Sequence, residues 1–250
     1  MKILITGGFG LLGSRLANHY SYLGHEVVVA TSNKHFISEN TYYEIKYFNW
    51  EVENDLINIC RQINLVIHAA GMNASQCISD PISAYKFNCI NTERLFRASI
   101  LCNVNKFIFL STAHVYSNNL LGVITEETNP SNSHPYAQTN LAAEMALSNP
   151  FDKNIINVQI LRLSNVIACP IFNNTNCWDL LLNDLCKQSI TNGFLEIKNK
   201  VDTKRDFIPI KSLLNIFDDL IFGIYSNLTG IINIGSNTTF KISEIANLIA

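Results

Sequence analysis

The stretch Lys2–Gly13 reads KILITGGFGLLG. Its first five residues are typical of a buried strand, and the residues that follow it carry apolar side chains at helical spacing up to Gly24. Between strand and helix, the first glycine permits a tight turn, the second lets the backbone approach a pyrophosphate, and the third lets the helix lie close to the sheet. The start of the helix offers unpaired N–H groups to phosphates. The stretch therefore predicts a dinucleotide site that uses Gly7, Gly10, Leu11, Leu12 and Gly13.

The rest of the chain alternates short β-branched runs with longer amphipathic stretches, the pattern of right-handed βαβ units. We expect an α/β fold of the Rossmann type, a doubly wound parallel sheet covered on both faces. Residues 1–165 are predicted to form the dinucleotide-binding domain. Residues 166–250 are predicted to form a smaller substrate-binding lobe interleaved with the sheet, either complete or truncated at its last helix. The predicted strands are 2–6, 26–30, 65–69, 107–111, 156–163 and 231–234, and the predicted helices are 81–102, 178–190, 210–225 and one from residue 135.

The composition narrows the classes of function. With 48% hydrophobic and 15% charged residues among 250, the chain can bury a large core, which argues against disorder. A formal net charge of −2 supplies no basic field for nucleic acid. No apolar run approaches the ~20 residues needed to cross a bilayer, so we expect no membrane partner. The seven cysteines include no Cys-x-x-Cys pair, so we expect a reduced, cytoplasmic protein with no metal site.

The end of the second predicted strand bears on the choice of dinucleotide. An acidic side chain there would bind the ribose diol of NAD, but the chain continues Thr31, Ser32, Asn33 and Lys34. Without a carboxylate a 2′-phosphate is not repelled, and Lys34 with the small polar groups could receive it. The segment favours NADP over NAD, and an ordinary solvated turn is the alternative.

Six further motifs follow in order along the chain. They are VIHAAG (66–71), KFNCINT (86–92), FIFLSTAHVYS (107–117), HPYAQTN (134–140), LRLSNV (161–166) and RDFIPI (205–210). Together with the glycine turn, this run resembles the extended short-chain dehydrogenase/reductase family, the NAD-dependent epimerases and dehydratases that act on nucleotide sugars. The resemblance extends over essentially the whole chain.

The resemblance implies roles for individual residues. Tyr136 would be the acid/base, with the Thr112 hydroxyl holding the same substrate oxygen and Asn49 near the adenine. Arg205 would meet the diphosphate of the substrate, oriented by Asp206, although an ordinary surface Arg–Asp pair is the alternative. The remaining expected contacts with cofactor are Ala69, Ala70, Gly71, Asn88 and Ser111, and the remaining expected contacts with substrate are Asn73 and Asn165.

Asn140 is the main departure from the family pattern, because a lysine is expected four residues after the tyrosine. Its amide shares a helical face with Tyr136 and can reach a ribose hydroxyl, but it carries no charge. Three interpretations stay open: His114 or His134 supplies the charge, the enzyme is slow or takes an activated substrate, or the site only binds cofactor. The last would make the chain a non-catalytic NAD(P)-binding sensor or accessory protein.

A second departure from the family pattern limits the type of reaction that the resemblance implies. Dehydratases of the family carry an Asp–Glu pair after the strand hydroxyl, whereas this chain has Ala113 and His114. Alanine cannot protonate a leaving hydroxyl, so the resemblance implies an NAD(P)-dependent epimerase or ketoreductase that acts on a nucleotide-activated sugar. By analogy with many relatives, the chain could form a homodimer.

Overall fold

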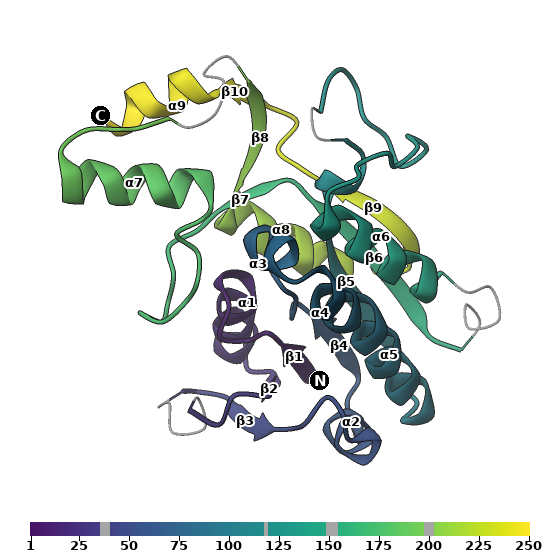
Figure 1. The fold of residues 1–250 in the computed structure, drawn as a ribbon. Coiled ribbons are helices and arrows are strands. Elements are labelled where there is room, and N and C mark those ends of the chain that lie inside the picture. The colour runs from purple at the N-terminus through teal and green to yellow at the C-terminus, as the bar shows by residue number, and fades with distance from the viewer. Residues whose placement is uncertain (36–40, 118–119, 149–154, 198–202) are drawn as a thin grey trace.

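The computed structural model describes residues 1–35, 41–117, 120–148, 155–197 and 203–250. A parallel sheet of seven strands in the order β3-β2-β1-β4-β5-β6-β9 forms its centre (Figure 1). The strands are β1 (Lys2–Thr6), β2 (Glu26–Thr31), β3 (Glu44–Tyr47), β4 (Leu65–His68), β5 (Lys106–Thr112), β6 (Asn157–Leu163) and β9 (Gly230–Ile234). Apolar runs in the inner strands bury both faces of the sheet, which confirms the predicted doubly wound α/β fold.

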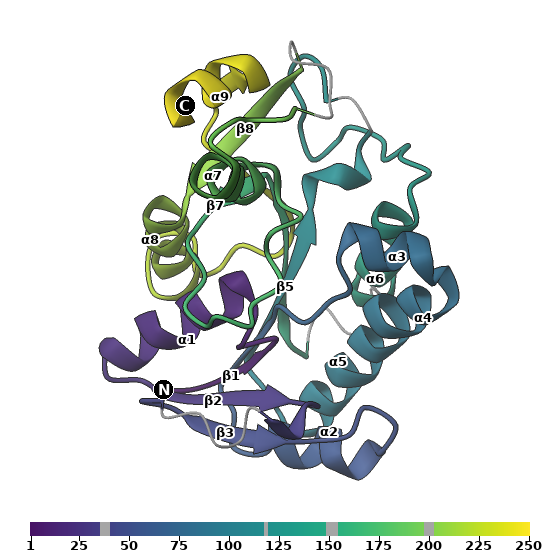
Figure 2. The same ribbon diagram turned by 60° about the vertical axis from the view of Figure 1, so that its left-hand side comes forward.

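Helices cover both faces of this sheet (Figure 2). On one face, α1 (Leu11–Tyr22) and α8 (Ile210–Ile221) pack against side chains that include Ile5, Ile67 and Leu161. The other face is covered by α2 (Glu53–Cys60), α5 (Asn91–Leu101) and α6 (Pro135–Leu147). The alternation of inward-facing residues along each strand divides the core into these two layers.

The helix predicted over residues 81–102 is interrupted. It consists of α4 (Pro81–Tyr85), a π-helical turn η2 (Lys86–Ile90) and α5, and it follows the short helix α3 (Ala74–Ser79). Within this segment the Thr92 hydroxyl donates to the carbonyl of Asn88 at 2.7 Å. Such π turns inside α-helices are frequent at functional sites, and this one presents Asn88 toward α6.

The C-terminal part of the chain contributes to both the large sheet and a small lobe. Strand β9 pairs with β6 in the large sheet. The lobe is a three-stranded sheet with two helices beside it, α7 and α9, whose small core includes Leu185, Phe207 and Ile245 (Figure 1). Its elements are β7 (Asn165–Ile167), α7 (Leu181–Asn192), β8 (Lys204–Pro209), β10 (Thr239–Lys241) and α9 (Ile242–Ile249).

The strand order reverses between β1 and β4, which are neighbours at the centre of the sheet. In open parallel sheets ligands bind beyond the carboxyl ends of the strands at such a switch point. The glycine turn after β1 and the 3₁₀ turn η3 (Ala113–Val115) after β5 both lie at this edge. Within the described ranges, no helix is both long and apolar enough to span a membrane.

Candidate active site

The glycine turn after β1 leaves no room for a side chain at Gly7 or at Gly13. Gly7 has a φ of +70°, and a Cβ added there would lie 2.7 Å from the backbone of Ala69 and Ala70. A Cβ on Gly13 would lie 2.2 Å from the carbonyl oxygen of Gly7. The amide of Gly10 donates to that same oxygen at 2.9 Å, so the turn is closed by its own backbone. The first turn of α1, with Leu11 and Leu12, therefore begins against the end of β1.

The chain after β7 packs against this turn. Phe172 contacts Phe9 with ring centroids 5.1 Å apart, and the hydroxyl of Thr175 donates to the carbonyl of Phe9 at 3.1 Å. Arg15 on α1 donates to the carbonyl of Cys169 through Nε at 3.0 Å and Nη2 at 2.6 Å. The small lobe and the glycine turn are thus joined at the edge where the predicted dinucleotide site lies.

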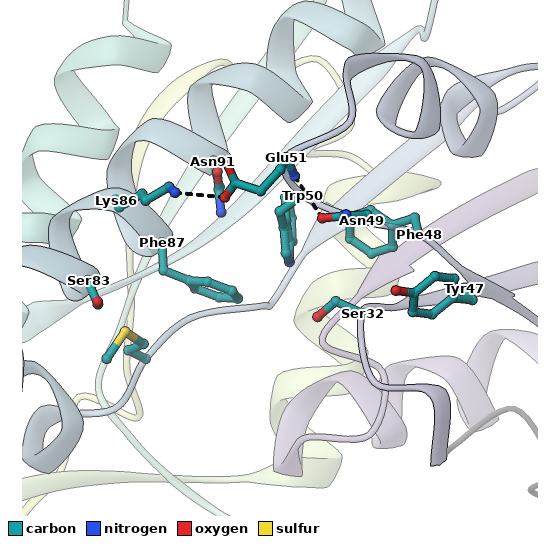
Figure 3. Close-up of a pocket in the computed structure, with 11 residues that line it drawn as sticks. Ser32, Tyr47, Phe48, Asn49, Trp50, Glu51, Ser83, Lys86, Phe87 and Asn91 are labelled. Atoms are coloured by element: carbon teal, nitrogen blue, oxygen red, sulfur yellow. Dashed lines mark hydrogen bonds and ion pairs between the residues drawn. The ribbon is translucent and has the colours of Figure 1, made fainter.

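A cavity of about 340 Å³ lies between the ends of β2 and β3 and the helix segment α4–η2 (Figure 3). Asn49 lines it, next to Trp50, whose ring meets Phe48 at 4.6 Å and Phe87 at 5.5 Å in edge-on contacts. Lys86 forms an ion pair with Glu51 at its rim. Sequence reasoning pointed to Asn49 but missed the aromatic walls, because nothing local marks Phe87 as a neighbour of Trp50.

The end of β2 forms a compact polar turn. The amide of Asn33 donates to the Thr31 hydroxyl at 3.1 Å, while Ser32 lines the cavity. The Lys34 ammonium lies 5.0 Å from the centre of the Tyr47 ring, and Tyr47 also lines the cavity. The turn therefore places one lysine and several neutral donors beside the cavity.

Tyr136 and Thr112 come together although they lie on different elements. Thr112 ends β5, and its oxygen accepts the amide of His114 at 3.1 Å, while Tyr136 stands in the first turn of α6. Burial raises the pKa of the Tyr136 phenol, hydrogen bonding with Thr112 opposes that rise, and the nearby thiol of Cys77 adds to it. Cys77, which is fully buried on α3, was not anticipated, and no local signal in the sequence singles it out.

Asn140 and the two histidines lie around the tyrosine. The Asn140 amide nitrogen donates to the Tyr136 carbonyl at 2.8 Å, so this side chain folds back on its own helix. His134 caps α6 by accepting the Tyr136 amide on Nδ1 at 3.1 Å. Burial, with Arg205 and His134 nearby, lowers the pKa of His114. His134 therefore uses Nδ1 to cap α6, and burial disfavours the charged form of His114.

Asn88 holds the segment after β4 against α6. Its Oδ1 accepts the amide of Met72 at 2.7 Å, and its Nδ2 donates to Thr139 at 3.1 Å. Gly71 lies next to it: a Cβ there would be 3.5 Å from Asn88 Oδ1. Asn73 caps α3: its side-chain oxygen accepts a hydrogen bond from the amide of Gln76 at 2.9 Å. This oxygen is therefore engaged in the helix cap.

A buried polar network that sequence reasoning missed lies behind the site. Glu144 on α6 pairs with Arg162 on β6, with Nη2 2.6 Å from Oε2. The Ser111 hydroxyl donates to Glu144, so Ser111 faces this network, although it was expected to contact cofactor. The Arg162 guanidinium also lies over the ring of Tyr116 at 4.6 Å, and the hydroxyl of Tyr116 donates to Asn233 at 2.7 Å. The network joins α6, β5, β6 and β9.

On the lobe side, Arg205 is half-buried on β8, and burial lowers its pKa. Asp206, next along the strand, accepts hydrogen bonds from the amides of Ser236 and Thr238, so it ties down that loop. Neighbouring residues on a strand point to opposite faces, so Asp206 is not placed to orient Arg205. Asn165 donates to the carbonyl of Asp206 at 2.9 Å and joins β7 to β8.

Comparison with known proteins identifies the family. The model of the NAD dependent epimerase/dehydratase family matches residues 3–235. The UDP-glucose 4-epimerase of Bacillus subtilis is 31% identical over 160 residues, 59% of this chain and 47% of that protein. The GDP-6-deoxy-D-talose 4-dehydrogenase of Aggregatibacter actinomycetemcomitans is 24% identical over 260 residues, 100% of this chain and 79% of that protein.

Among solved structures, the UDP-glucose 4-epimerase of Thermotoga maritima with UDP-glucose superposes with a TM-score of 0.85 at 22% identity, over 100% of this chain and 81% of that one. That likeness shows the fold. The matched segment spans about half the length of the Bacillus epimerase, while the family model spans nearly all of this chain. The chain therefore belongs to the NAD-dependent epimerase/dehydratase family of enzymes.

Proposed function

We propose that the chain binds a nicotinamide dinucleotide along the carboxyl edge of the sheet and catalyses hydride transfer on a nucleotide-activated sugar, with Tyr136 as the acid/base. The interaction between the Thr112 hydroxyl and the Tyr136 phenol carries the proposal, because it joins two groups that can share one substrate oxygen. The relatives support the substrate class, since one is a UDP-glucose 4-epimerase and another a GDP-sugar dehydrogenase.

The residues present fit such a dinucleotide. Gly7 and Gly13 let the turn close tightly against the segment after β4 and against the start of α1, and α1 presents its first amides at this edge of the sheet. The cavity beside Trp50 and Asn49 has the volume and the aromatic walls that suit a flat base. When bound, the nicotinamide supplies or accepts the hydride. The chain itself positions the sugar oxygen between Thr112 and Tyr136 and moves the proton at the phenol oxygen.

Three finer features belong to the same proposal. Lys34 beside the cavity favours NADP over NAD, because no carboxylate in the turn after β2 repels a 2′-phosphate. Arg205 binds the diphosphate of the substrate, since a guanidinium matches phosphate oxygens. Two copies pair through the helices next to Tyr136, where Ile90 and Met145 are exposed.

The test begins with nicotinamide binding. NADH and NADPH are titrated into the protein while their fluorescence is followed, and a panel of UDP-, dTDP- and GDP-sugars is then added. We expect binding and a product peak that falls roughly 100-fold or more in Tyr136→Phe, while that variant still binds the coenzyme. Unchanged product formation in Tyr136→Phe would overturn the assignment of the acid/base. Binding without any turnover would instead favour the sensor interpretation that Asn140 raises.

A further inference from the structure

A row of buried polar side chains connects the ends of β1 and β4 with the helix that follows η2. The hydroxyl of Thr6, the last residue of β1, lies 2.6 Å from Nδ1 of His68, the last residue of β4. Nε2 of His68 lies 2.8 Å from the hydroxyl of Thr92 on α5. That hydroxyl donates to the carbonyl of Asn88 in η2 at 2.7 Å. All four residues are at most 3% exposed, so these bonds are shielded from bulk water.

The direction of each hydrogen bond in this polar row follows from the last one. Because Thr92 donates its single proton to the Asn88 carbonyl, its oxygen accepts from Nε2 of His68. Nδ1 of the neutral ring is then an acceptor, and the Thr6 hydroxyl donates to it. The three bonds therefore point the same way, and removing one member leaves a buried polar group without its partner.

The side chain of Asn88 extends the polar row to two segments of the candidate site. Its Oδ1 accepts the amide of Met72 at 2.7 Å, and Met72 lines the cavity beside Trp50. Its Nδ2 donates to the Thr139 hydroxyl at 3.1 Å, and this hydroxyl donates to the carbonyl of Tyr136 at 3.1 Å. Asn88 thus holds the segment after β4 and the first turn of α6 at a fixed separation.

Thr92 determines how Asn88 is presented. A threonine hydroxyl that bonds the carbonyl four residues earlier competes with the helical backbone and bends a helix. Here that bond lies where η2 joins α5, so it acts on the turn from which the Asn88 side chain projects. His68 donates to the same hydroxyl and holds it in the orientation that makes this bond. Without the hydroxyl, the turn and the Asn88 side chain lose this fixed orientation.

Resting on the proposed function, we propose that Thr92 and His68 are positioning residues, which act through Asn88 to align the first turn of α6 with the coenzyme segment after β4. Their effect falls on the alignment of Tyr136 with the coenzyme more than on binding, because the glycine turn and the cavity beside Trp50 remain in place. A misplacement of about 1 Å in an active site can lower a rate roughly 100-fold.

The first experiment needs neither coenzyme nor substrate. Amide hydrogen exchange is followed by mass spectrometry in the full chain and in Thr92→Val, which keeps the shape of the side chain and removes its hydroxyl. We expect exchange to rise roughly tenfold in peptides that cover residues 69–73 and 135–140, and to change much less in the glycine turn and in β6. Thr92→Ser, which retains the hydroxyl, should exchange like the parent. A uniform rise over the whole chain in Thr92→Val would reject the inference, because it would report only a less stable fold.

Ser99 provides the matched control on the same helix. It lies two turns further along α5, is fully buried, and donates to the carbonyl of Leu95 at 2.8 Å, so it makes the same kind of bond away from the site. Ser99→Ala should raise exchange around α5 and leave residues 135–140 unchanged. An equal rise at residues 135–140 in Ser99→Ala and Thr92→Val would show that α6 responds to any weakening of α5, contrary to the inference.

The second experiment separates alignment from binding. NADH affinity is measured by nicotinamide fluorescence, and kcat and KM are measured with the UDP-, dTDP- or GDP-sugar that the parent converts. For Thr92→Val we expect kcat to fall roughly 10- to 100-fold while the Kd of NADH and the KM change less than about threefold, and Thr92→Ser should restore kcat. A parent-like kcat in Thr92→Val would reject the inference and leave the proposed function standing. If the parent converts no sugar, the proposed function fails, and hydrogen exchange alone decides whether Thr92 holds α6.

A double-mutant cycle tests whether His68 acts through Thr92. His68→Leu should lower kcat in the parent, but in the Thr92→Val background it should lower kcat further by less than about twofold, because both residues belong to one row. Thr6→Val, which removes the donor on the other side of the ring, replaces His68→Leu in the cycle if that variant does not fold. Effects that multiply would show that His68 does not act through Thr92.

Discussion

Glu144 on α6 and Arg162 on β6 form an ion pair at 2.6 Å in which both side chains are almost completely buried. The Ser111 hydroxyl donates to the same carboxylate. Two charges in a dry interior are stable only while each compensates the other. Because Glu144 lies on the helix that carries Tyr136, this pair fixes the catalytic helix against β5 and β6.

Removing one partner of this buried ion pair should lower the stability of the fold. We expect Glu144→Gln to lower the free energy of unfolding by about 3–5 kcal/mol, because the Arg162 guanidinium is left buried without its counter-charge. Urea unfolding followed by circular dichroism measures the change. The matched control is Glu93→Gln in the exposed Glu93–Arg97 pair on α5, where we expect a loss of about 0.5 kcal/mol or less. Similar losses in both variants would contradict a structural role for the buried pair.

A second stability prediction concerns His68, which is buried between Thr6 and Thr92. The ring accepts on Nδ1 from the Thr6 hydroxyl at 2.6 Å and donates from Nε2 to Thr92 at 2.8 Å, since the Thr92 hydroxyl is itself committed as donor to Asn88. Burial lowers the pKa of His68 from 6.5 to about 3. Its neutral form therefore stabilises the fold fully above pH 6.5, and this contribution is lost as the pH falls from 6.5 toward 3.

The expected result is a steeper loss of stability in acid for the parent than for His68→Gln. The contribution of this histidine is about 1.4 kcal/mol per pH unit below 6.5. Urea unfolding at intervals between pH 7 and pH 4 measures it, and the slope should be smaller by that amount in His68→Gln. Equal slopes for the parent and His68→Gln would show that His68 titrates normally.

The sequence predicted the parts of the fold that depend on local pattern. The apolar runs of β1, β2, β4, β5 and β6 mark buried strands whatever their neighbours are. By contrast, β3 is largely exposed and carries two charges in EIKY, and β7 and β10 have three residues each, so no period is visible. These three strands were not predicted, and β8 was also missed. The π turn η2 was missed as well, because its residues continue the helical pattern on both sides.

The residues of the candidate site could likewise be predicted where a local motif marks them, but not where packing decides their neighbours. Motifs in the chain pointed to Tyr136 and Thr112, and the structure brings these two together. They did not point to Cys77 or Trp50, whose neighbours come from distant segments and are decided by packing. Ser111 lies in a motif that the sequence analysis recognised, but the motif did not predict the direction of its side chain. That side chain faces Glu144, because successive residues on β5 point to opposite faces.

A third prediction tests the glycine turn. A Cβ on Gly13 would lie 2.2 Å from the carbonyl oxygen of Gly7. This oxygen belongs to the backbone, which cannot rotate away from the clash as a flexible side chain can. We expect Gly13→Ala to lower the free energy of unfolding by about 1–3 kcal/mol and to weaken NADH binding at least roughly tenfold, since α1 must move away from the phosphates.

Gly71→Ala is the matched control for stability. Its added Cβ would meet only Asn88 Oδ1 at 3.5 Å, an ordinary contact distance. We expect a change within about 0.5 kcal/mol for this variant. If Gly13→Ala were as stable as Gly71→Ala and bound NADH like the parent, the close packing of helix on turn would not matter for the coenzyme.

The last prediction concerns the choice between NADP and NAD. Lys34 is exposed, lies 5.0 Å above the Tyr47 ring, and follows Ser32 at the rim of the aromatic cavity. A 2′-phosphate at this rim would gain a charge-assisted contact with the ammonium, whereas the ribose diol of NADH has no charge to offer. We expect Lys34→Ala to weaken NADPH binding roughly tenfold and to change NADH binding by less than about twofold, as measured by nicotinamide fluorescence at constant ionic strength.

Lys187, which lies 5.4 Å from the Trp178 ring, provides a lysine of similar setting away from the cavity, and Lys187→Ala should leave both affinities unchanged. Equal weakening of NADPH and NADH in Lys34→Ala would show that this lysine does not distinguish the 2′-phosphate.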